Sequence, residues 1–222
     1  MTTSAWWGAL RESGVSREEV FVTTKLDRPY AAYDRALAGC DHSLQELGLD
    51  HVDLLLIHEP YAQAREMWRA LVELREQGKA GHIGVSNFQG RFLEDFLSWC
   101  DAEGLPQPEL DQIEAHVYWT QASTREALSR RGILVQAWAP FTEGRRHIFR
   151  DPTLVGVGRR HGRTAAQVAL RYLLQLGVAV VPKSSRRPRM AENLDVFGFE
   201  LDADDMARIA RLDEGRSLFG WY

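Results

Sequence analysis

The chain has few cysteines and no long apolar run, and these absences exclude several classes of protein. Its 222 residues include two cysteines, Cys40 and Cys100, and their wide spacing matches no disulfide framework, metal motif or redox motif. We expect both to be small buried residues in a reducing cytoplasm. The longest apolar stretches, such as 52–57, fall far short of the roughly 20 residues that span a bilayer. Residues 1–14 lack the basic start and apolar stretch of a signal peptide, so the sequence predicts a cytoplasmic protein without membrane contact.

The charge and composition are those of an ordinary globular chain. The net charge is -4, with 45% hydrophobic and 26% charged residues, which argues against disorder and low-complexity repeats. A mildly acidic balance gives no general attraction to nucleic acid or to an anionic membrane. No linker divides the chain, so we expect a single domain over residues 1–222, although the length also allows two small ones.

Short β-prone runs recur along the chain, with helix-prone stretches between them. The first four begin about thirty residues apart, the size of one βα unit, and several are apolar at consecutive positions, as in a parallel sheet covered on both faces. Thr164 and Gln167 form a predicted capping box, and six glycines follow helical patterns, where a left-handed residue ends a helix. The six runs are 20–25, 52–58, 82–87, 111–118, 133–140 and 178–184, and the glycines are Gly14, Gly48, Gly78, Gly104, Gly132 and Gly177.

Polar side chains gather where these runs end. One polar residue after a strand is usually the start of a loop, but here the pattern repeats at five ends. In parallel α/β folds the carboxyl ends of the strands converge on the ligand site. The sequence therefore predicts one polar site built from distant segments. The residues concerned are Lys25, His58, Ser86, Asn87, Gln112 to His116, Lys183 and Ser184.

Five segments, in this order and spacing, resemble the aldo-keto reductases, which are NADPH-dependent (β/α)8-barrel enzymes that reduce aldehydes and ketones to alcohols. They are FVTTK at 21–25, DLLLIHEP at 53–60, GHIGVSNF at 81–88, AQVALR at 166–171 and VPKSSRRPRMAEN at 181–193. The resemblance covers almost the whole chain. It implies an α/β fold of the (β/α)8 TIM-barrel type with about six βα units, lacking the first two strands, and an N-terminally incomplete barrel domain.

The resemblance assigns catalytic roles to Lys25 and His58. Family enzymes place an Asp, a Tyr, a Lys and a His around a small-molecule carbonyl substrate. The tyrosine hydroxyl protonates the carbonyl oxygen, and the nearby ammonium lowers the pKa of that tyrosine. Lys25 matches the family lysine and His58 the histidine, but Met1-Thr2-Thr3, near the family tyrosine position, holds neither Asp nor Tyr. Impaired turnover is therefore expected.

Three explanations for the missing pair stay open. The true start codon lies upstream, the gene is a natural truncation, or another group supplies the proton. The first is favoured because unpaired parallel edges of an open barrel are costly and prone to aggregation. A truncated chain could cover those edges as a homodimer, whereas the full-length enzyme is expected to be a monomer. The candidate substitute donors are His58, which titrates near neutral pH, and, as the weakest idea, Tyr30 after Lys25.

A basic segment after the last predicted strand indicates a phosphate ligand. Lys183, Arg186, Arg187 and Arg189 bring four positive charges into seven residues of an acidic chain. Such a run is usually a solvated surface, but here a predicted helix N-terminus follows, which also favours phosphate. The segment resembles the family's 2′-phosphate site, which favours NADPH over NADH. Lys183, Ser184 and Arg189 match phosphate contacts, and Glu192 and Asn193 match adenine contacts.

The resemblance also implies a nicotinamide site. Ser86, Asn87 and Gln112 match residues that hydrogen-bond the carboxamide, and Trp138 matches an aromatic residue that stacks on the ring. His116 is expected to be structural. The candidates for an apolar substrate wall are Trp6, Trp7, Trp119 and Phe141.

Two other functions fit the sequence. A remnant could bind NADPH as a sensor or store without reducing anything. An unrelated barrel lyase or isomerase could form a Schiff base at Lys25, and this alternative predicts no nicotinamide binding.

Overall fold

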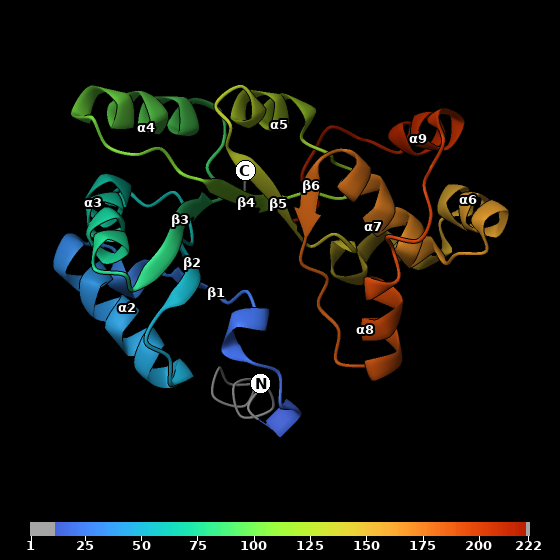
Figure 1. Cartoon of the computed structure of the whole chain (residues 1–222). Helices are drawn as coiled ribbons and strands as arrows, with labels where there is room; N and C mark the ends of the chain where they lie inside the picture. Colours follow the sequence, from blue (N-terminus) through green and yellow to red (C-terminus); the bar gives the residue numbers. More distant parts are fainter. Residues whose placement is uncertain (1–11, 221–222) are drawn as a thin grey trace. The chain divides into compact units, whose positions relative to one another are not determined.

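The computed structural model describes residues 12–220, in which six strands alternate with helices (Figure 1). The chain divides into two compact units, Met1–Asp111 and Gln112–Tyr222, which are described in turn. All six predicted strands are present, although most are shorter than predicted. They are β1 (Thr23–Leu26), β2 (Val52–Ile57), β3 (Ala80–Ser86), β4 (Leu110–Glu114), β5 (Leu134–Trp138) and β6 (Val178–Val180).

The first unit is built on the parallel strands β1, β2 and β3, with Lys25 opposite Leu56 and Ile57 opposite Val85. Strand β2 is covered on both faces, as its run of apolar residues predicts, because all four residues from Leu54 to Ile57 are buried. Figure 1 shows helices α2 and α3 beside these strands. The helices are α2 (Tyr33–Leu47), α3 (Ala64–Glu76) and α4 (Gly90–Glu103), with 3-10 turns η1 (Arg17–Glu19) and η2 (Arg28–Tyr30).

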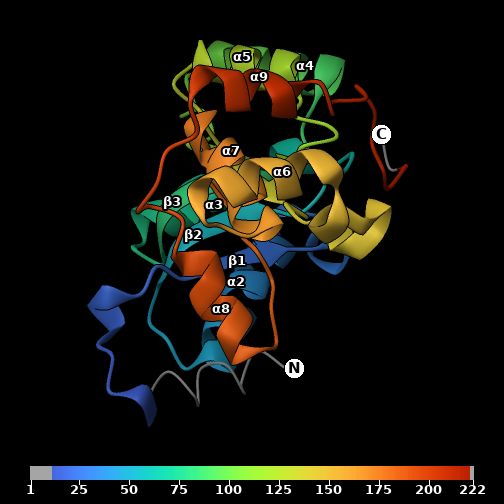
Figure 2. The same cartoon turned by 90° about the vertical axis from the view of Figure 1, so that its right-hand side faces the viewer.

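The second unit carries the parallel pair β5 and β6, with Val135 opposite Val178. Helices α6 and α7 lie side by side (Figure 2), and α7 begins at the predicted capping box of Thr164 and Gln167. The remaining elements are α5 (Ala122–Ser129), η3 (Thr142–Arg150), α6 (Pro152–His161), α7 (Ala165–Gln175), α8 (Arg187–Leu194) and α9 (Ala203–Ala210).

The predicted helix ends are confirmed, whereas one predicted strand is too long. All six predicted glycines have φ between 64° and 76°, the left-handed region that lacks a penalty only for glycine. The run 111–118 leaves the sheet after Glu114, because His116 and Trp119 exchange both backbone hydrogen bonds in a tight turn. A β-prone run of sequence can therefore extend beyond the residues that pair in the sheet.

Both cysteines are free and fully buried, as predicted. Burial raises the pKa of the Cys40 thiol to about 11 and that of Cys100 to about 12, so neither forms the reactive thiolate near neutral pH. Within residues 12–220 no helix combines the length and apolarity that a membrane crossing requires. The candidate wall residues Trp6 and Trp7 lie outside the described residues.

Candidate functional site

The carboxyl ends of β1, β2 and β3 place three predicted site residues near one another. The backbone N–H of His58 donates to the carbonyl of Leu26 at 3.0 Å, next to Lys25 at the end of β1. Asn87, which follows β3, donates from Nδ2 to the carbonyl oxygen of His58 at 3.4 Å and to Glu59 Oε1 at 3.1 Å. Ser86 and Asn87 are buried. The expected clustering of Lys25, His58 and Asn87 is therefore found within the first unit.

Burial and mutual repulsion act on the two candidate catalytic groups. Burial lowers the pKa of the Lys25 ammonium, while the carboxylates of Glu59 and Asp27 act in the opposite direction. Burial, followed by the charge of Lys25, lowers the pKa of the His58 imidazole, and Asp27 opposes both. Shifted pKa values of this kind, at the ends of parallel strands, are typical of functional sites.

Two members of this cluster, Asp27 and Tyr61, were not predicted from the sequence. Asp27 Oδ1 lies 3.7 Å from His58 Nδ1, and the Tyr61 hydroxyl donates to the same oxygen. The Arg28 guanidinium lies 5.9 Å from the centre of the Tyr61 ring. Their only sequence signal is position, because Asp27 stands two residues after Lys25 and Tyr61 three after His58. Tyr30, in contrast, packs its ring against Gly39 of α2.

Asp111 is a fully buried residue whose carboxyl group lies close to the backbone of Asn87 and Phe88. Burial raises its pKa well above the ordinary value, although the backbone N–H groups of Phe88 and Asn87 act in the opposite direction. Asn87 itself has a φ of 65°, an uncommon backbone conformation for a residue other than glycine. A buried carboxyl group with a raised pKa therefore lies close to the backbone of a predicted cofactor-binding residue.

Replacing Asp111 with asparagine is expected to stabilise the protein in alkaline solution. Because the folded-state pKa is raised, the free energy of unfolding falls as pH rises from the unfolded pKa through the folded one. Asparagine removes this loss, so we expect a gain of about 1–3 kcal/mol at pH 8 and little change at pH 4. Urea denaturation at both pH values measures it, with the exposed Asp95→Asn as control. An equal effect at both pH values would contradict the assignment.

In the second unit, the predicted phosphate and adenine residues line a single cavity of about 520 Å³. Its wall combines cationic, hydroxyl and amide groups, the donors that phosphate oxygens and a purine ring require. Arg187, although in the same basic run, is not among the residues that line it. The lining includes Lys183, Ser184, Arg186, Arg189, Glu192 and Asn193.

The local sequence explains how this wall forms. Strand β6 ends at Val180, and Pro182, which has no N–H to donate, follows shortly after. The Ser184 hydroxyl then accepts from the backbone N–H of Arg186 at 3.1 Å, which turns the chain into α8. Across the cavity wall, Thr164 Oγ1 donates to Glu192 Oε1 at 2.5 Å. The Glu192 carboxylate is thus held in place by the residue that caps α7.

A neighbouring cavity of about 590 Å³ shares Phe141, Phe149, Lys183 and Arg189 with the first. One of its walls is the segment after β5, where several residues other than glycine have positive φ. Strain of this kind is concentrated at ligand sites and moving segments. Phe141, a predicted wall residue, therefore lines both cavities. The strained residues are Ala139, Thr142, Glu143, Arg146 and His147.

The other predicted nicotinamide residues of this unit have protein partners. Gln112 Nε2 donates to Gln136 Oε1 at 2.6 Å, and the rings of Trp138 and Phe219 lie 4.9 Å apart. The C-terminal segment that carries Phe219 is bound to the buried Glu114 through Ser217 and Leu218.

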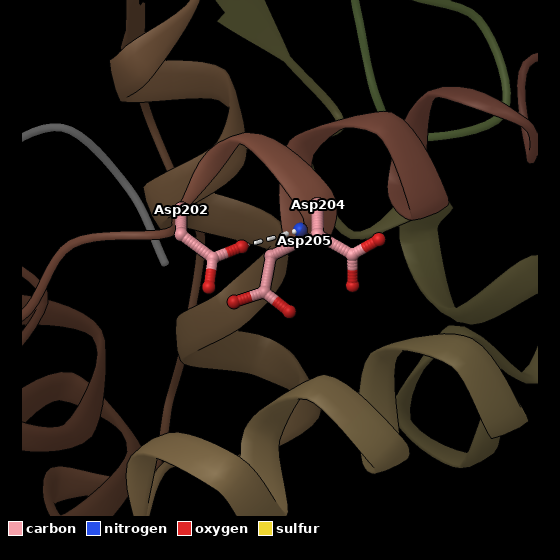
Figure 3. Close-up of side chains that lie close together, drawn as sticks. All are labelled: Asp202, Asp204 and Asp205. Atoms are coloured by element: carbon pink, nitrogen blue, oxygen red, sulfur yellow. Dashed lines mark hydrogen bonds between the residues drawn. The ribbon is translucent and has the colours of Figure 1, made fainter.

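Three aspartates at the start of α9 resemble a metal site but form a helix cap. The side chain of Asp202 accepts from the backbone N–H of Asp205 at 2.8 Å (Figure 3). Arg160 forms ion pairs with Asp202, Asp204 and Asp205, so one guanidinium already partly neutralises the cluster. Capping and ion pairing account for this arrangement.

Comparisons with known proteins agree with these features. A model described as the Aldo/keto reductase family matches residues 7–214. A glyoxal reductase of Bacillus subtilis is 40% identical over 206 residues, 92% of this chain and 72% of that protein.

Two solved structures extend the comparison to the fold. MGS-M4, an aldo-keto reductase from a Medee basin deep-sea metagenome library, matches with a TM-score of 0.92 and 32% identity over 98% of this chain and 80% of its own. The Bombyx mori aldo-keto reductase AKR2E4, in complex with NADP, matches with a TM-score of 0.88 and 31% identity over 97% of this chain and 75% of its own. Such neighbours are TIM barrels, so the predicted fold class is confirmed. The absence of two barrel strands stays a prediction.

Proposed function

Because this chain belongs to the aldo/keto reductase family, we propose that it catalyses the NADPH-dependent reduction of small aldehydes and ketones to alcohols. The observation that carries the proposal is the cavity of the second unit, which gathers Lys183, Ser184, Arg189, Glu192 and Asn193. Four cationic side chains line it, counting Arg150 and Arg186, in a chain with a net charge of -4. A local concentration of positive charge in an acidic protein fits an anionic ligand.

The residues present fit NADPH by charge and by hydrogen-bonding type. Lys183, Ser184 and Arg189 would bind the 2′-phosphate, since Arg and Lys form strong charge-assisted hydrogen bonds with phosphate oxygens. Glu192 and Asn193 would contact the adenine. Ser86, Asn87 and Gln112 are proposed to bind the nicotinamide carboxamide, and Trp138 to stack on the ring. When bound, NADPH supplies the hydride for the reduction.

The chain's own catalytic groups in this proposal are Lys25 and His58. The Lys25 ammonium, next to Glu59 and Asp27, would place positive charge where negative charge develops on the carbonyl oxygen. The His58 imidazole would orient that oxygen by a hydrogen bond. Since residues 1–11 contain neither aspartate nor tyrosine, we propose that turnover by the 222-residue chain is slow.

The first test is cofactor binding, followed by turnover. We expect NADPH fluorescence to change on titration with the purified protein, and NADPH to be consumed slowly with glyoxal or a reactive aromatic aldehyde. Binding without consumption at any pH would favour a non-catalytic NADPH-binding protein. Absence of binding would contradict the proposal and favour Schiff-base chemistry at Lys25, which borohydride trapping with a carbonyl substrate detects.

A further inference from the structure

We propose that Thr164 is a positioning residue for base recognition. It holds the Glu192 carboxylate so that one oxygen accepts a hydrogen bond from the exocyclic amine of adenine, while hypoxanthine is rejected. The inference rests on the proposed function, because it deepens the cofactor site of the second unit. It is carried by the hydrogen bond from Thr164 Oγ1 to Glu192 Oε1 at 2.5 Å and by the cavity that both residues line.

The Thr164 hydroxyl is fixed by the helix that it caps. Its oxygen accepts from the backbone N–H of Gln167 at 3.2 Å, and the Gln167 side chain accepts from the backbone N–H of Thr164 at 3.0 Å. These reciprocal bonds form the capping box at the start of α7. A hydroxyl group has one proton to donate, and an ionised carboxylate only accepts. The Thr164 proton is therefore directed at Glu192 while the Thr164 oxygen caps α7.

The backbone that carries Glu192 is held from the same turn of α7. Helices α7 and α8 are in contact (Figure 1). Gln167 Nε2 donates to the backbone carbonyl of Asp195 at 2.8 Å and to that of Glu192 at 3.4 Å. Arg163 forms an ion pair with the Asp195 side chain. The backbone and the carboxylate of Glu192 are therefore both bound by residues at the start of α7.

The charge of Glu192 does not suit a phosphate ligand. Among the described residues that line the cavity, Glu192 is the only acidic one, while four are cationic. Within the described part of the chain, its carboxylate has Thr164 as its partner and forms no ion pair with those cations. An acidic group beside a phosphate weakens phosphate binding by repulsion. Its presence therefore indicates a part of the ligand that donates hydrogen bonds, as the exocyclic amine of adenine does.

A held carboxylate distinguishes between two purine bases. With Oε1 bound to Thr164, Oε2 is left to accept a second hydrogen bond. Adenine carries an amine that donates, whereas hypoxanthine carries at the same ring position a carbonyl oxygen that only accepts. Two facing acceptors lose water without gaining a partner. A carboxylate without Thr164 can turn toward the ring N–H of hypoxanthine, so the bond from Thr164 makes the choice of base strict.

The test compares NADPH with its deamino analogue, in which hypoxanthine replaces adenine and the phosphates and the nicotinamide are unchanged. Fluorescence titrations give the two dissociation constants, and their ratio measures the preference for adenine. We expect the wild type to bind NADPH roughly 10–100-fold more tightly than the analogue, the size of one buried acceptor left unpaired. Equal affinities in the wild type would overturn the inference.

The decisive variants change Thr164. Thr164→Val removes the donor at nearly constant volume and is expected to lower the preference about 3–10-fold. Since valine also removes the α7 cap, Thr164→Asp is the matched variant, because aspartate caps helices well but has no proton to donate. It should lower the preference by as much, and its added charge acts on both nucleotides alike. Thr164→Ser keeps the cap and the donor, so it should retain the preference within about 2-fold.

Two further variants separate base recognition from folding. Glu192→Gln should abolish the preference, because a glutamine amide can turn its NH2 group toward the carbonyl oxygen of hypoxanthine. Asp202→Ala removes the cap of α9 in the same unit, away from the residues that line the cavity, and should leave the preference unchanged. A loss of preference in Asp202→Ala as large as that in Thr164→Val would assign the effect to stability and overturn the role of Thr164.

Adenosine 2′,5′-bisphosphate and its inosine analogue distinguish this inference from the proposed function, because neither contains nicotinamide. If calorimetry shows that the adenosine nucleotide is preferred and that Thr164→Val loses this preference, the inference holds even when the chain consumes no NADPH. If NADPH is consumed but the preference is unchanged in Thr164→Val and Thr164→Asp, the inference fails and the proposed function stands. If none of these nucleotides binds, both fail.

Discussion

Replacing Lys183 with glutamate is expected to weaken NADPH binding roughly 100-fold while weakening NADH binding less than about 3-fold. The reason is the difference between the two ligands, which is only the 2′-phosphate. Lys183 lines the cavity together with Arg186 and Arg189, and the substitution replaces an attractive charge by a repulsive one at close range. The Lys183 side chain is exposed, so the change should leave folding intact.

The same basic run supplies the control for this experiment. Arg187 carries the same charge but does not line the cavity, so Arg187→Glu should change NADPH affinity only slightly, through long-range charge that salt screens. Fluorescence titrations of both variants with NADPH and with NADH give four dissociation constants. Equal losses for the two nucleotides in Lys183→Glu would remove the 2′-phosphate assignment.

The fold was predictable because its strands are encoded locally. Strand β2 is apolar at consecutive positions and lies between two neighbours, so its residues Leu54 to Ile57 identify a buried parallel strand from sequence alone. The ends of strands were less predictable. His116 follows a β-prone run, but its backbone bonds to Trp119 turn the chain out of the sheet, and nothing in the β propensity of the run indicates that turn.

The candidate site was only partly predictable, for a different reason. Lys25 and His58 stand in segments that resemble a known family, and position in those segments was sufficient to single them out. Position alone did not single out Asp27 and Tyr61. Their importance comes from a contact between side chains that follow different strands, which periodicity and spacing do not report. Taken by sequence alone, Asp27 is an ordinary loop aspartate before a 3-10 turn that it also caps.

Replacing Glu114 with alanine is expected to lower the free energy of unfolding by about 3–5 kcal/mol. The Glu114 carboxylate is fully buried, 3.0 Å from His116 Nε2, and accepts from Ser217 Oγ at 2.6 Å and from the Leu218 N–H at 2.9 Å. Nδ1 of His116 has no hydrogen-bond partner among the described residues. Alanine would therefore leave both nitrogens of a buried ring unpaired, which agrees with the structural role expected for His116.

The stabilisation by Glu114 should also depend on pH in a definite direction. Burial raises the pKa of Glu114, but the bonds from His116, Ser217 and Leu218 outweigh it, and the net pKa is lowered. A lowered folded-state pKa means that the contribution is complete above the unfolded value of about 4.3 and is lost as pH falls through the folded one. The difference between wild type and Glu114→Ala, measured by urea denaturation, should therefore shrink in strong acid. A pH-independent difference would contradict the carboxylate's role.

A functional consequence separates this anchor from an ordinary core residue. Ser217 and Leu218 hold the segment that packs Phe219 against Trp138, and Trp138 is the residue proposed to stack on the nicotinamide. Freeing the segment should change the fluorescence of Trp138. The control is Glu126→Ala, which breaks an exposed ion pair with Arg130 in the same unit. It should leave the fluorescence unchanged and alter the free energy of unfolding by no more than about 0.5 kcal/mol. Comparing the NADPH affinity of the two variants then separates two roles of Phe219. If Phe219 competes with the cofactor for the Trp138 ring, Glu114→Ala binds NADPH more tightly than the wild type. If Phe219 completes the site, Glu114→Ala binds NADPH more weakly.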